Sequence, residues 1–405
     1  MYEFSNAVNS RHSEDIKRLL KQSSGKNMIS FAGGMPNNDL FPVKEIDAIY
    51  NSLPTNLKQL CFQYGPASGY LPLIKSLQSY LRTKGLPIDT DKILITTGSL
   101  QAISIITQEF VNKGDIILTE NPSFVGALSV FETYEAEIHG VPIDKEGINI
   151  EALKRKIASL DRRPKLLYVT PNFHNPAGII YTPERKKALL DVLSGTGIIL
   201  IEDDAYSDLY FKEKDKYLTK PMKSYRATDV EIIYTGSFSK ILGPGFRLGY
   251  MLSSPEIFEK AETVKQALDA CTSNFMQILA NEFLSQNKLH PYLKFLRKEY
   301  AERKNILQLS LKKYMPKEII WNEPKGGFYC WLKLPEHISS TDVFEESVKK
   351  GVVFVTGRTF DPASIKDDRI RLSFSNMPKN TIEKGVEILA EALKKVIENS
   401  KIEIS

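Results

Sequence analysis

The sequence lacks the features that mark secreted, metal-binding and membrane-spanning proteins. Its three cysteines, Cys61, Cys271 and Cys330, lie far apart and form no Cys-x-x-Cys pair, which predicts reduced and mostly buried thiols. The five histidines show no paired ligand spacing, so no metal site is expected. No basic region followed by an apolar run opens the chain, and no apolar stretch is long enough to span a bilayer. These absences predict a soluble, cytoplasmic protein without a metal or a membrane partner.

The chain also lacks a strong net charge and a dinucleotide-binding fingerprint. Its 54 basic and 49 acidic residues are interspersed, and the net charge of +5 is too weak to predict nucleic-acid binding. No Gly-x-Gly-x-x-Gly follows an expected strand, no Walker sequence is present, and Gly243-Pro244-Gly245 precedes a strand. A nicotinamide oxidoreductase is therefore disfavoured.

Short apolar runs alternate with helical patterns from about residue 90 to residue 255, which predicts an α/β fold with a largely parallel sheet. Several runs are continuously apolar, as expected of strands buried on both faces. Later residues predict a smaller α+β unit. The expected strands are 93–96, 116–118, 166–169, 198–201, 232–234, 248–252, 327–332 and 369–374, and the expected helices include 13–22 with Ser13 as its cap, 183–193, 259–286, 292–314, 341–350 and 381–399.

Polar clusters follow four of these strands, at the sheet edge where parallel α/β proteins bind ligands. Each cluster has an ordinary explanation as a helix cap, a turn or a solvated strand end, but their agreement on one edge favours a binding site. The clusters are Gly98-Ser99, Asn175 in Pro171–Pro176, Asp203, and Ser237-Phe238-Ser239-Lys240.

The chemistry of these clusters suits one kind of ligand. Lys240, Arg247 and the nearby hydroxyls suit a phosphorylated aldehyde, and the N–H groups that open the helix after Gly98 suit its phosphate. An acid at a strand end, Asp203, suits a ring nitrogen. Pyridoxal 5′-phosphate (PLP) has all of these groups, and enzymes bind it through a lysine and an acidic partner of the ring nitrogen. Lys240 alone is weak evidence, because most lysines are solvated surface charges.

The chain resembles the fold-type I PLP-dependent aminotransferases of class I/II, and within them the kynurenine/2-aminoadipate aminotransferases and their multisubstrate microbial relatives. The resemblance runs from Ser30-Phe31-Ala32-Gly33-Gly34-Met35-Pro36 to Arg371-Leu372-Ser373-Phe374-Ser375. It implies an N-terminal helix and segment at 1–45 that contributes to the small domain and a substrate lid. A large PLP-binding domain would follow at 46–290, with a mostly parallel seven-stranded sheet between helices. A small domain would then occupy 291–405.

The resemblance also assigns the cofactor contacts. Lys240 would bond the cofactor and move the proton between the substrate Cα and the cofactor C4′. Asp203 would hold the ring nitrogen protonated, and it is preferred to Asp204 because the family places a tyrosine, here Tyr206, three residues later. Tyr206 and Asn175 would bind the phenolic oxygen. The phosphate would be held by Gly98, Ser99, Ser237, Ser239 and Arg247.

Substrate and partner contacts follow from the same resemblance. Arg371 would clamp the substrate α-carboxylate with help from Asn175, and Gly33 and Gly34 would line the substrate pocket through their backbone. Tyr64 would reach the phosphate of the neighbouring subunit, which implies a homodimer with shared active sites.

The chain departs from the family pattern at Phe124, at Lys17, and at His174 and Ala177 in the loop around Asn175. Phe124 takes the place of the common tyrosine that stacks on the cofactor ring. Lys17 takes the place of an arginine that contacts acidic substrate side chains in several relatives.

The expected reaction moves an amino group from an L-amino acid to a 2-oxo acid such as 2-oxoglutarate by a ping-pong mechanism. Expected donors are aromatic, long aliphatic or of the 2-aminoadipate and glutamate type. Another PLP chemistry, such as a β-lyase or a cyclopropane synthase, remains an alternative that Arg371 disfavours. A transcription regulator with an aminotransferase-like domain is also disfavoured, because the fold begins within about thirty residues and leaves no room for a preceding DNA-binding domain.

Overall fold

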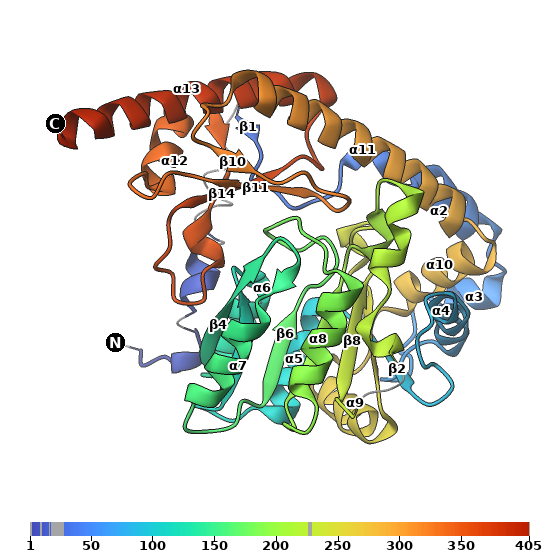
Figure 1. Cartoon of the computed structure of the whole chain (residues 1–405). Coiled ribbons are helices and arrows are strands. Elements are labelled where there is room, and N and C mark those ends of the chain that lie inside the picture. Colours follow the sequence, from blue (N-terminus) through green and yellow to red (C-terminus); the bar gives the residue numbers. More distant parts are fainter. Residues whose placement is uncertain (1, 9, 16, 18–27, 226–228, 405) are drawn as a thin grey trace.

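The computed structural model describes residues 2–8, 10–15, 17, 28–225 and 229–404 (Figure 1). A sheet of eight strands, in the order β2-β9-β8-β7-β6-β3-β4-β5, is the centre of this described part. The neighbours from β8 to β4 are parallel, whereas β9 is antiparallel to β2 and β8, and β5 is antiparallel to β4. The expected mostly parallel sheet is therefore confirmed, with the two-residue β5 as an addition to seven longer strands. The strands are β2 Lys92–Thr96, β3 Ile116–Asn121, β4 Glu137–Asp144, β5 Gly147–Ile148, β6 Leu166–Val169, β7 Ile199–Asp204, β8 Ile232–Ser237 and β9 Gly249–Ser253.

Helices cover both faces of this sheet because successive strand residues point to opposite sides. Ile117 and Ile201 pack with the helices of one face, whereas Leu118 and Leu200 pack with those of the other. The first face carries α5 Ser99–Phe110, α6 Val125–Thr133 and α9 Pro255–Asp269, and the second carries α7 Ile150–Ser159 and α8 Pro183–Leu193 (Figure 1).

A smaller unit of strands and helices packs around a core of its own, which includes Phe31, Leu372 and Leu393. Its antiparallel sheet has the order β10-β11-β14-β13, and β1 from the N-terminal segment pairs in parallel with β12. Figure 1 shows this unit above the large sheet, with α11 and α13 running across its outer side. The elements are β1 Ile29–Ser30, α11 Leu289–Tyr314, β10 Ile320–Trp321, β11 Tyr329–Lys333, α12 Ser340–Lys349, β12 Val352–Val353, β13 Val355–Thr356, β14 Arg369–Ser373 and α13 Lys379–Ile404.

The single helix expected at 259–286 is wrong. The chain breaks between α9 and α10, where Ala270 has a φ of +61° and turns the backbone out of the helical path. The second half packs against helices that precede the sheet. The second half is α10 Asn274–Ser285, and the helices before the sheet are α2 Val43–Ser52, α3 Thr55–Leu60 and α4 Leu71–Thr83. Short 3-10 helices lie at Asn6–Val8, Asn38–Leu40, Ser207–Leu209, Glu213–Thr219, Met222–Ser224, Pro244–Phe246 and Gly357–Phe360.

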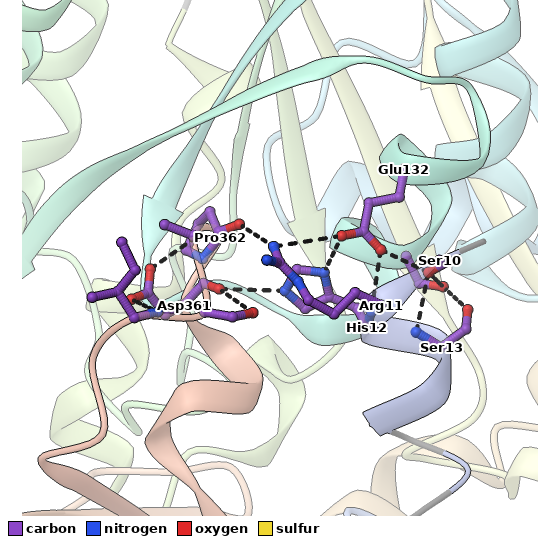
Figure 2. A network of polar contacts seen from close by, with 11 residues as sticks. Ser10, Arg11, His12, Ser13, Glu132, Asp361 and Pro362 are labelled. Atoms are coloured by element: carbon purple, nitrogen blue, oxygen red, sulfur yellow. Dashed lines mark hydrogen bonds and ion pairs between the residues drawn. The ribbon is translucent and has the colours of Figure 1, made fainter. Parts of the chain in front are cut away.

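The first helix begins at Arg11, and the expectation that Ser13 caps it is also wrong. The Ser10 hydroxyl accepts the Ser13 N–H at 3.1 Å and so satisfies a free donor of the first turn. His12, in that turn, is fully buried, with its Nδ1 2.7 Å from Glu132 of α6 and its Nε2 3.3 Å from the Asp361 carbonyl oxygen (Figure 2). The first helix therefore joins α6 to the smaller unit. Residues 16 and 18–22 of the expected helix lie outside the described residues.

Two further expectations concern cysteines and membrane spans. All three cysteines are free, and Cys61 and Cys330 are buried while Cys271 is half-buried, which confirms the prediction of reduced thiols. Within the described ranges, none of the helices combines the length and the apolar character that crossing a bilayer requires.

Candidate functional site

A cavity of about 350 Å³ lies at the carboxyl edge of the parallel strands, beneath the smaller unit. The structure brings most of the predicted site residues together in its wall. They enter from the ends of β2, β7 and β8, from the segments after β1, β3, β6 and β8, and from β14. The predicted residues that line it are Gly34, Gly98, Ser99, Phe124, Asn175, Asp203, Tyr206, Ser237, Ser239, Lys240, Arg247 and Arg371.

Lys240 follows β8 and places its amine in this cavity. The Nζ atom donates a hydrogen bond to the Gly34 carbonyl oxygen at 2.8 Å. Burial lowers the pKa of Lys240 from 10.5 to about 8, with further lowering by the positive charges of Arg371 and Arg247. A lysine amine must be neutral to attack a carbonyl, so this environment makes Lys240 a suitable nucleophile near neutral pH.

Asp203 is the last residue but one of β7 and is buried in the cavity wall. Its two carboxylate oxygens accept hydrogen bonds from the Tyr168 hydroxyl at 2.7 Å and from the Thr235 hydroxyl at 2.9 Å. Burial raises the pKa of Asp203 to about 6, and these two hydrogen bonds oppose the rise. No lysine or arginine pairs with it in the described part of the chain. A buried carboxylate without a cation suits a ligand that brings a positive charge.

The neighbouring carboxylate, Asp204, does not line the cavity. Its side chain accepts hydrogen bonds from the Tyr234 hydroxyl at 2.6 Å and from the backbone N–H of Ser207 at 3.0 Å. Because successive strand residues face opposite sides, only one of the two acids can reach the cavity. The geometry therefore favours Asp203 over Asp204 as the ligand-facing acid.

An anion-binding cup forms where α5 begins. Gly98 has a φ of +85° and precedes the first turn. The Gln101 N–H of this turn donates to the Gly98 carbonyl oxygen at 3.2 Å, whereas the N–H groups of Ser99 and Leu100 have no partner within the helix and can bind an anion. A Cβ atom on Gly249 would lie 2.6 Å from the backbone nitrogen of Ser99, so glycine is needed for β9 to approach the cup. Arg247 closes one side, with its Nη2 atom 3.2 Å from the Thr97 carbonyl oxygen. The combination of free N–H groups and a guanidinium suits a phosphate.

Arg371 on β14 provides a second buried positive charge in the cavity. Its Nη1 atom donates to Asn175 Oδ1 at 2.9 Å, and its guanidinium lies 4.6 Å from the ring centre of Tyr329 and 4.8 Å from that of Phe360. Its Nε atom has no hydrogen-bond partner among the described residues. A buried guanidinium N–H without a hydrogen-bond partner lowers the stability of the fold, and a bound carboxylate would remove this cost by accepting the hydrogen bond.

Three predicted residues lie outside the cavity wall. Gly33 is the chain neighbour of Gly34, which does line the wall. Tyr64, in the loop between α3 and α4, is 80% exposed, and Lys17 is exposed on the first helix. The proposed contacts of Tyr64 and Lys17 therefore stay predictions.

The sequence interpretation missed other residues of the wall. Thr170 directly follows β6, so the strand-end rule that found Asp203 could have found it. Tyr329, whose hydroxyl lies 2.9 Å from that of Tyr206, comes from the antiparallel sheet and gave no such signal. The remaining missed residues are Met35, Leu100 and Ala205.

The wall offers each group that PLP requires. It combines the Lys240 amine of lowered pKa, the anion-binding cup at the start of α5, the buried carboxylate of Asp203 and the aromatic side chain of Phe124. The unpaired Nε atom of Arg371 remains for a substrate carboxylate. PLP therefore fits the residues present.

Comparison with known proteins agrees with this chemistry. The aminotransferase class I and II family matches residues 26–389. Aromatic-amino-acid aminotransferase 1 of Thermococcus litoralis is 34% identical over 397 residues, which cover 96% of this chain and 94% of the relative. The crystal structure of kynurenine aminotransferase from Pyrococcus horikoshii, in complex with PMP, is 34% identical, covers 97% of each chain and superposes with a TM-score of 0.91.

A third relative carries a cofactor adduct. The α-aminoadipate aminotransferase LysN from Thermus thermophilus, complexed with N-(5′-phosphopyridoxyl)-L-leucine, is 30% identical, covers 98% of each chain and has a TM-score of 0.86. These matches confirm the expected cofactor and reaction class, and they do not favour the β-lyase alternative. The chain belongs to the class I and II aminotransferases and is a PLP-dependent enzyme of fold type I that transfers amino groups.

Proposed function

We propose that the enzyme transfers the amino group of aromatic, long aliphatic and 2-aminoadipate or glutamate-type L-amino acids to 2-oxoglutarate. The observation that carries this proposal is one cavity whose wall holds both Lys240 and the hydrogen-bonded pair Arg371–Asn175. Arg371 would bind the α-carboxylate that every such substrate has, so it does not restrict the side chain. The named relatives, which act on aromatic amino acids, kynurenine and α-aminoadipate, support this range.

Each residue of the wall has a distinct task in this proposal. When bound, PLP supplies an electron sink for the charge that develops at the substrate Cα. With PLP bound, Lys240 would be the base that takes the proton from the substrate Cα and the acid that returns it. Asp203 keeps the ring nitrogen protonated through its negative charge. Tyr206 and Asn175 donate hydrogen bonds to the phenolic oxygen.

The remaining residues hold and orient the reactants. The first turn of α5, with Gly98 and Ser99, binds the phosphate together with Ser237, Ser239 and Arg247. Phe124 would pack against the ring, and its lack of a hydroxyl would leave this contact purely apolar.

A homodimer with shared active sites is part of the proposal. The loop after α3 exposes Phe62 and Tyr64 at 78% and 80%, and Leu71 at the start of α4 is also exposed. Solvent exposure of several large apolar side chains along one loop suits a surface that a second subunit covers. Tyr64 would then bind the phosphate in the neighbouring cavity.

Two experiments test the proposed function. Borohydride reduction of the purified enzyme followed by peptide mapping should place the cofactor on Lys240, and labelling of a different lysine would contradict the assignment. A half-reaction screen should then identify the donors: each amino acid is added alone, and the conversion of the cofactor absorbance to that of pyridoxamine phosphate is followed. Conversion by a single amino acid would refute the broad range.

A further inference from the structure

Two hydroxyl groups from different strands hold the carboxylate of Asp203. The Tyr168 hydroxyl, from β6, donates to Oδ2 at 2.7 Å, and the Thr235 hydroxyl, from β8, donates to Oδ1 at 2.9 Å. Strands β6 and β8 flank β7, which carries Asp203, and Thr235 is its register partner. Tyr168 and Thr235 are fully buried, and Asp203 is 3% exposed. Each carboxylate oxygen of Asp203 therefore accepts one hydrogen bond from a neighbouring strand, Oδ2 from β6 and Oδ1 from β8. Each oxygen keeps a further lone pair for a donor in the cavity.

These hydroxyls oppose the other influences on the charge of Asp203. Burial raises the pKa of Asp203, and the negative charges of Asp204 on the same strand and Glu120 at the end of β3 raise it further. The hydrogen bonds from Tyr168 and Thr235 lower it. Burial also raises the pKa of Tyr168 far above its usual value, so Tyr168 stays protonated and remains a donor.

Lys240 also faces Asp203 from the loop after β8, and its cationic form favours the carboxylate. It is unable to keep this role in the working enzyme, because the proposed function uses its amine to bond the cofactor. The two hydroxyls are then the donors that the chain itself supplies to Asp203 among the described residues.

We propose that Tyr168 and Thr235 are positioning residues that keep Asp203 ionised and aimed at the protonated ring nitrogen of PLP. The inference rests on the proposed role of Asp203 and adds the reason why a carboxylate buried so deeply can perform it. Without either hydroxyl the carboxyl group takes up a proton more readily and no longer favours the charged form of the ring.

The chain offers a matched control for this proposal. Tyr234 on β8 is as fully buried as Tyr168, and its hydroxyl donates to Asp204 Oδ2 at 2.6 Å. Tyr234→Phe therefore removes the same atom, from an equally buried side chain, on the carboxylate that does not line the cavity. Both Phe variants lose a buried hydrogen bond and should lower the melting temperature by similar amounts. If only Tyr168→Phe changes the protonation of the cofactor ring, the cause is the contact of Tyr168 with Asp203 and not a general loss of stability.

The test measures the ring nitrogen in the holoenzyme rather than activity alone. The enzyme is loaded with PLP labelled with ¹⁵N at the ring, and the ¹⁵N chemical shift is followed against pH, together with the release of PLP. In Tyr168→Phe the proton shared by the ring nitrogen and Asp203 should move toward the carboxyl group, so at each pH the ¹⁵N shift should report about tenfold less protonated ring relative to neutral ring than in the wild type, and PLP should be released more readily. Tyr234→Phe should follow the wild-type curve.

Thr235 gives an independent pair of variants. Thr235→Val removes the hydroxyl at similar volume and should shift both curves in the same direction as Tyr168→Phe, whereas Thr235→Ser keeps the donor and should restore the wild-type curve. Curves for Tyr168→Phe and Thr235→Val that coincide with those of Tyr234→Phe would overturn the proposal. Should either variant fail to fold, the other hydroxyl still decides the question.

Asp203→Asn separates this inference from the proposed function beneath it. Loss of the protonated ring in Asp203→Asn, with none in Tyr168→Phe or Thr235→Val, would overturn only the role of the hydroxyls. A ring that stays protonated in Asp203→Asn would overturn the assignment of Asp203 itself.

Discussion

Replacing Lys240 by methionine should stabilise the cofactor-free protein near neutral pH. Burial and nearby cations lower the pKa of Lys240 from 10.5 to about 8, a difference of about 2.5 units. At roughly 1.4 kcal/mol per unit, the ammonium group costs the folded state about 3 kcal/mol at pH 7. Its hydrogen bond to Gly34 offsets about 1 kcal/mol of that cost. A neutral side chain of similar length should therefore gain about 2 kcal/mol, to order of magnitude.

The gain should depend on pH in a defined direction. Because the pKa of Lys240 is lower in the folded chain than in the unfolded chain, the unfolded state binds more protons between about pH 8 and pH 10.5. The stability of the wild type therefore rises relative to the variant through this window. Lys240→Met should show its full advantage below pH 8 and none above pH 10.5.

Thermal unfolding of the cofactor-free proteins measures this difference. For a chain of 405 residues, about 2 kcal/mol corresponds to a rise of roughly 2–3 °C in melting temperature. Lys186→Met is the control, since burial also lowers the pKa of Lys186. The Lys186 ammonium, however, donates to the carbonyl oxygens of Leu218 at 2.7 Å and Lys220 at 2.8 Å, beside the buried Glu202.

Removing Lys186 leaves those groups without a partner, so its variant should melt lower than the wild type, opposite in sign to Lys240→Met. A Lys240→Met protein that melts below the wild type at pH 7 would refute the reasoning. So would a stabilisation that is unchanged at high pH.

Further predictions concern the reaction. Asp203→Asn should abolish most activity with little loss of stability, whereas Asp204→Asn should lower the melting temperature and keep most activity in the folded fraction; steady-state kinetics and thermal unfolding together would expose the reverse pattern. Mixing inactive Lys240→Ala subunits with weakened Tyr64→Phe subunits should restore some full-strength sites, and an active monomer in sedimentation would contradict the shared site. Lys17→Ala should raise the KM for 2-oxoglutarate and spare that for an aromatic donor, and unchanged values for both would remove Lys17 from the site.

The cofactor side of the site could be predicted because its residues obey a local rule. Asp203 comes two residues and Lys240 six residues after the end of an apolar run, and the carboxyl ends of parallel strands meet at one sheet edge. No knowledge of how distant segments pack is needed to place them. Thr170 obeys the same rule, but a threonine after a strand does not by itself indicate a catalytic or binding role, so it gave no signal.

The remaining features depend on packing that the sequence pattern does not encode. Tyr329 reaches the cavity from a sheet formed by later residues, so its place depends on how the two sheets meet. Strand β4 lies near the sheet edge with mostly half-exposed side chains, and it lacks the continuous apolar run of its neighbours. The break at Ala270 leaves the helical pattern of apolar residues intact on both sides, and alanine gives no signal for a positive φ.

The burial of His12 gives the N-terminus a mechanical role in the enzyme. Its ring bridges Glu132 of α6 and the Asp361 carbonyl, directly after Phe360, whose ring lies against Arg371. His12 thus acts as a brace behind Arg371, the proposed ligand of the substrate carboxylate. We therefore expect loss of the His12 ring to raise the KM for the substrate and to spare cofactor binding, so a change far from the cavity in sequence would be felt as a change in kinetics.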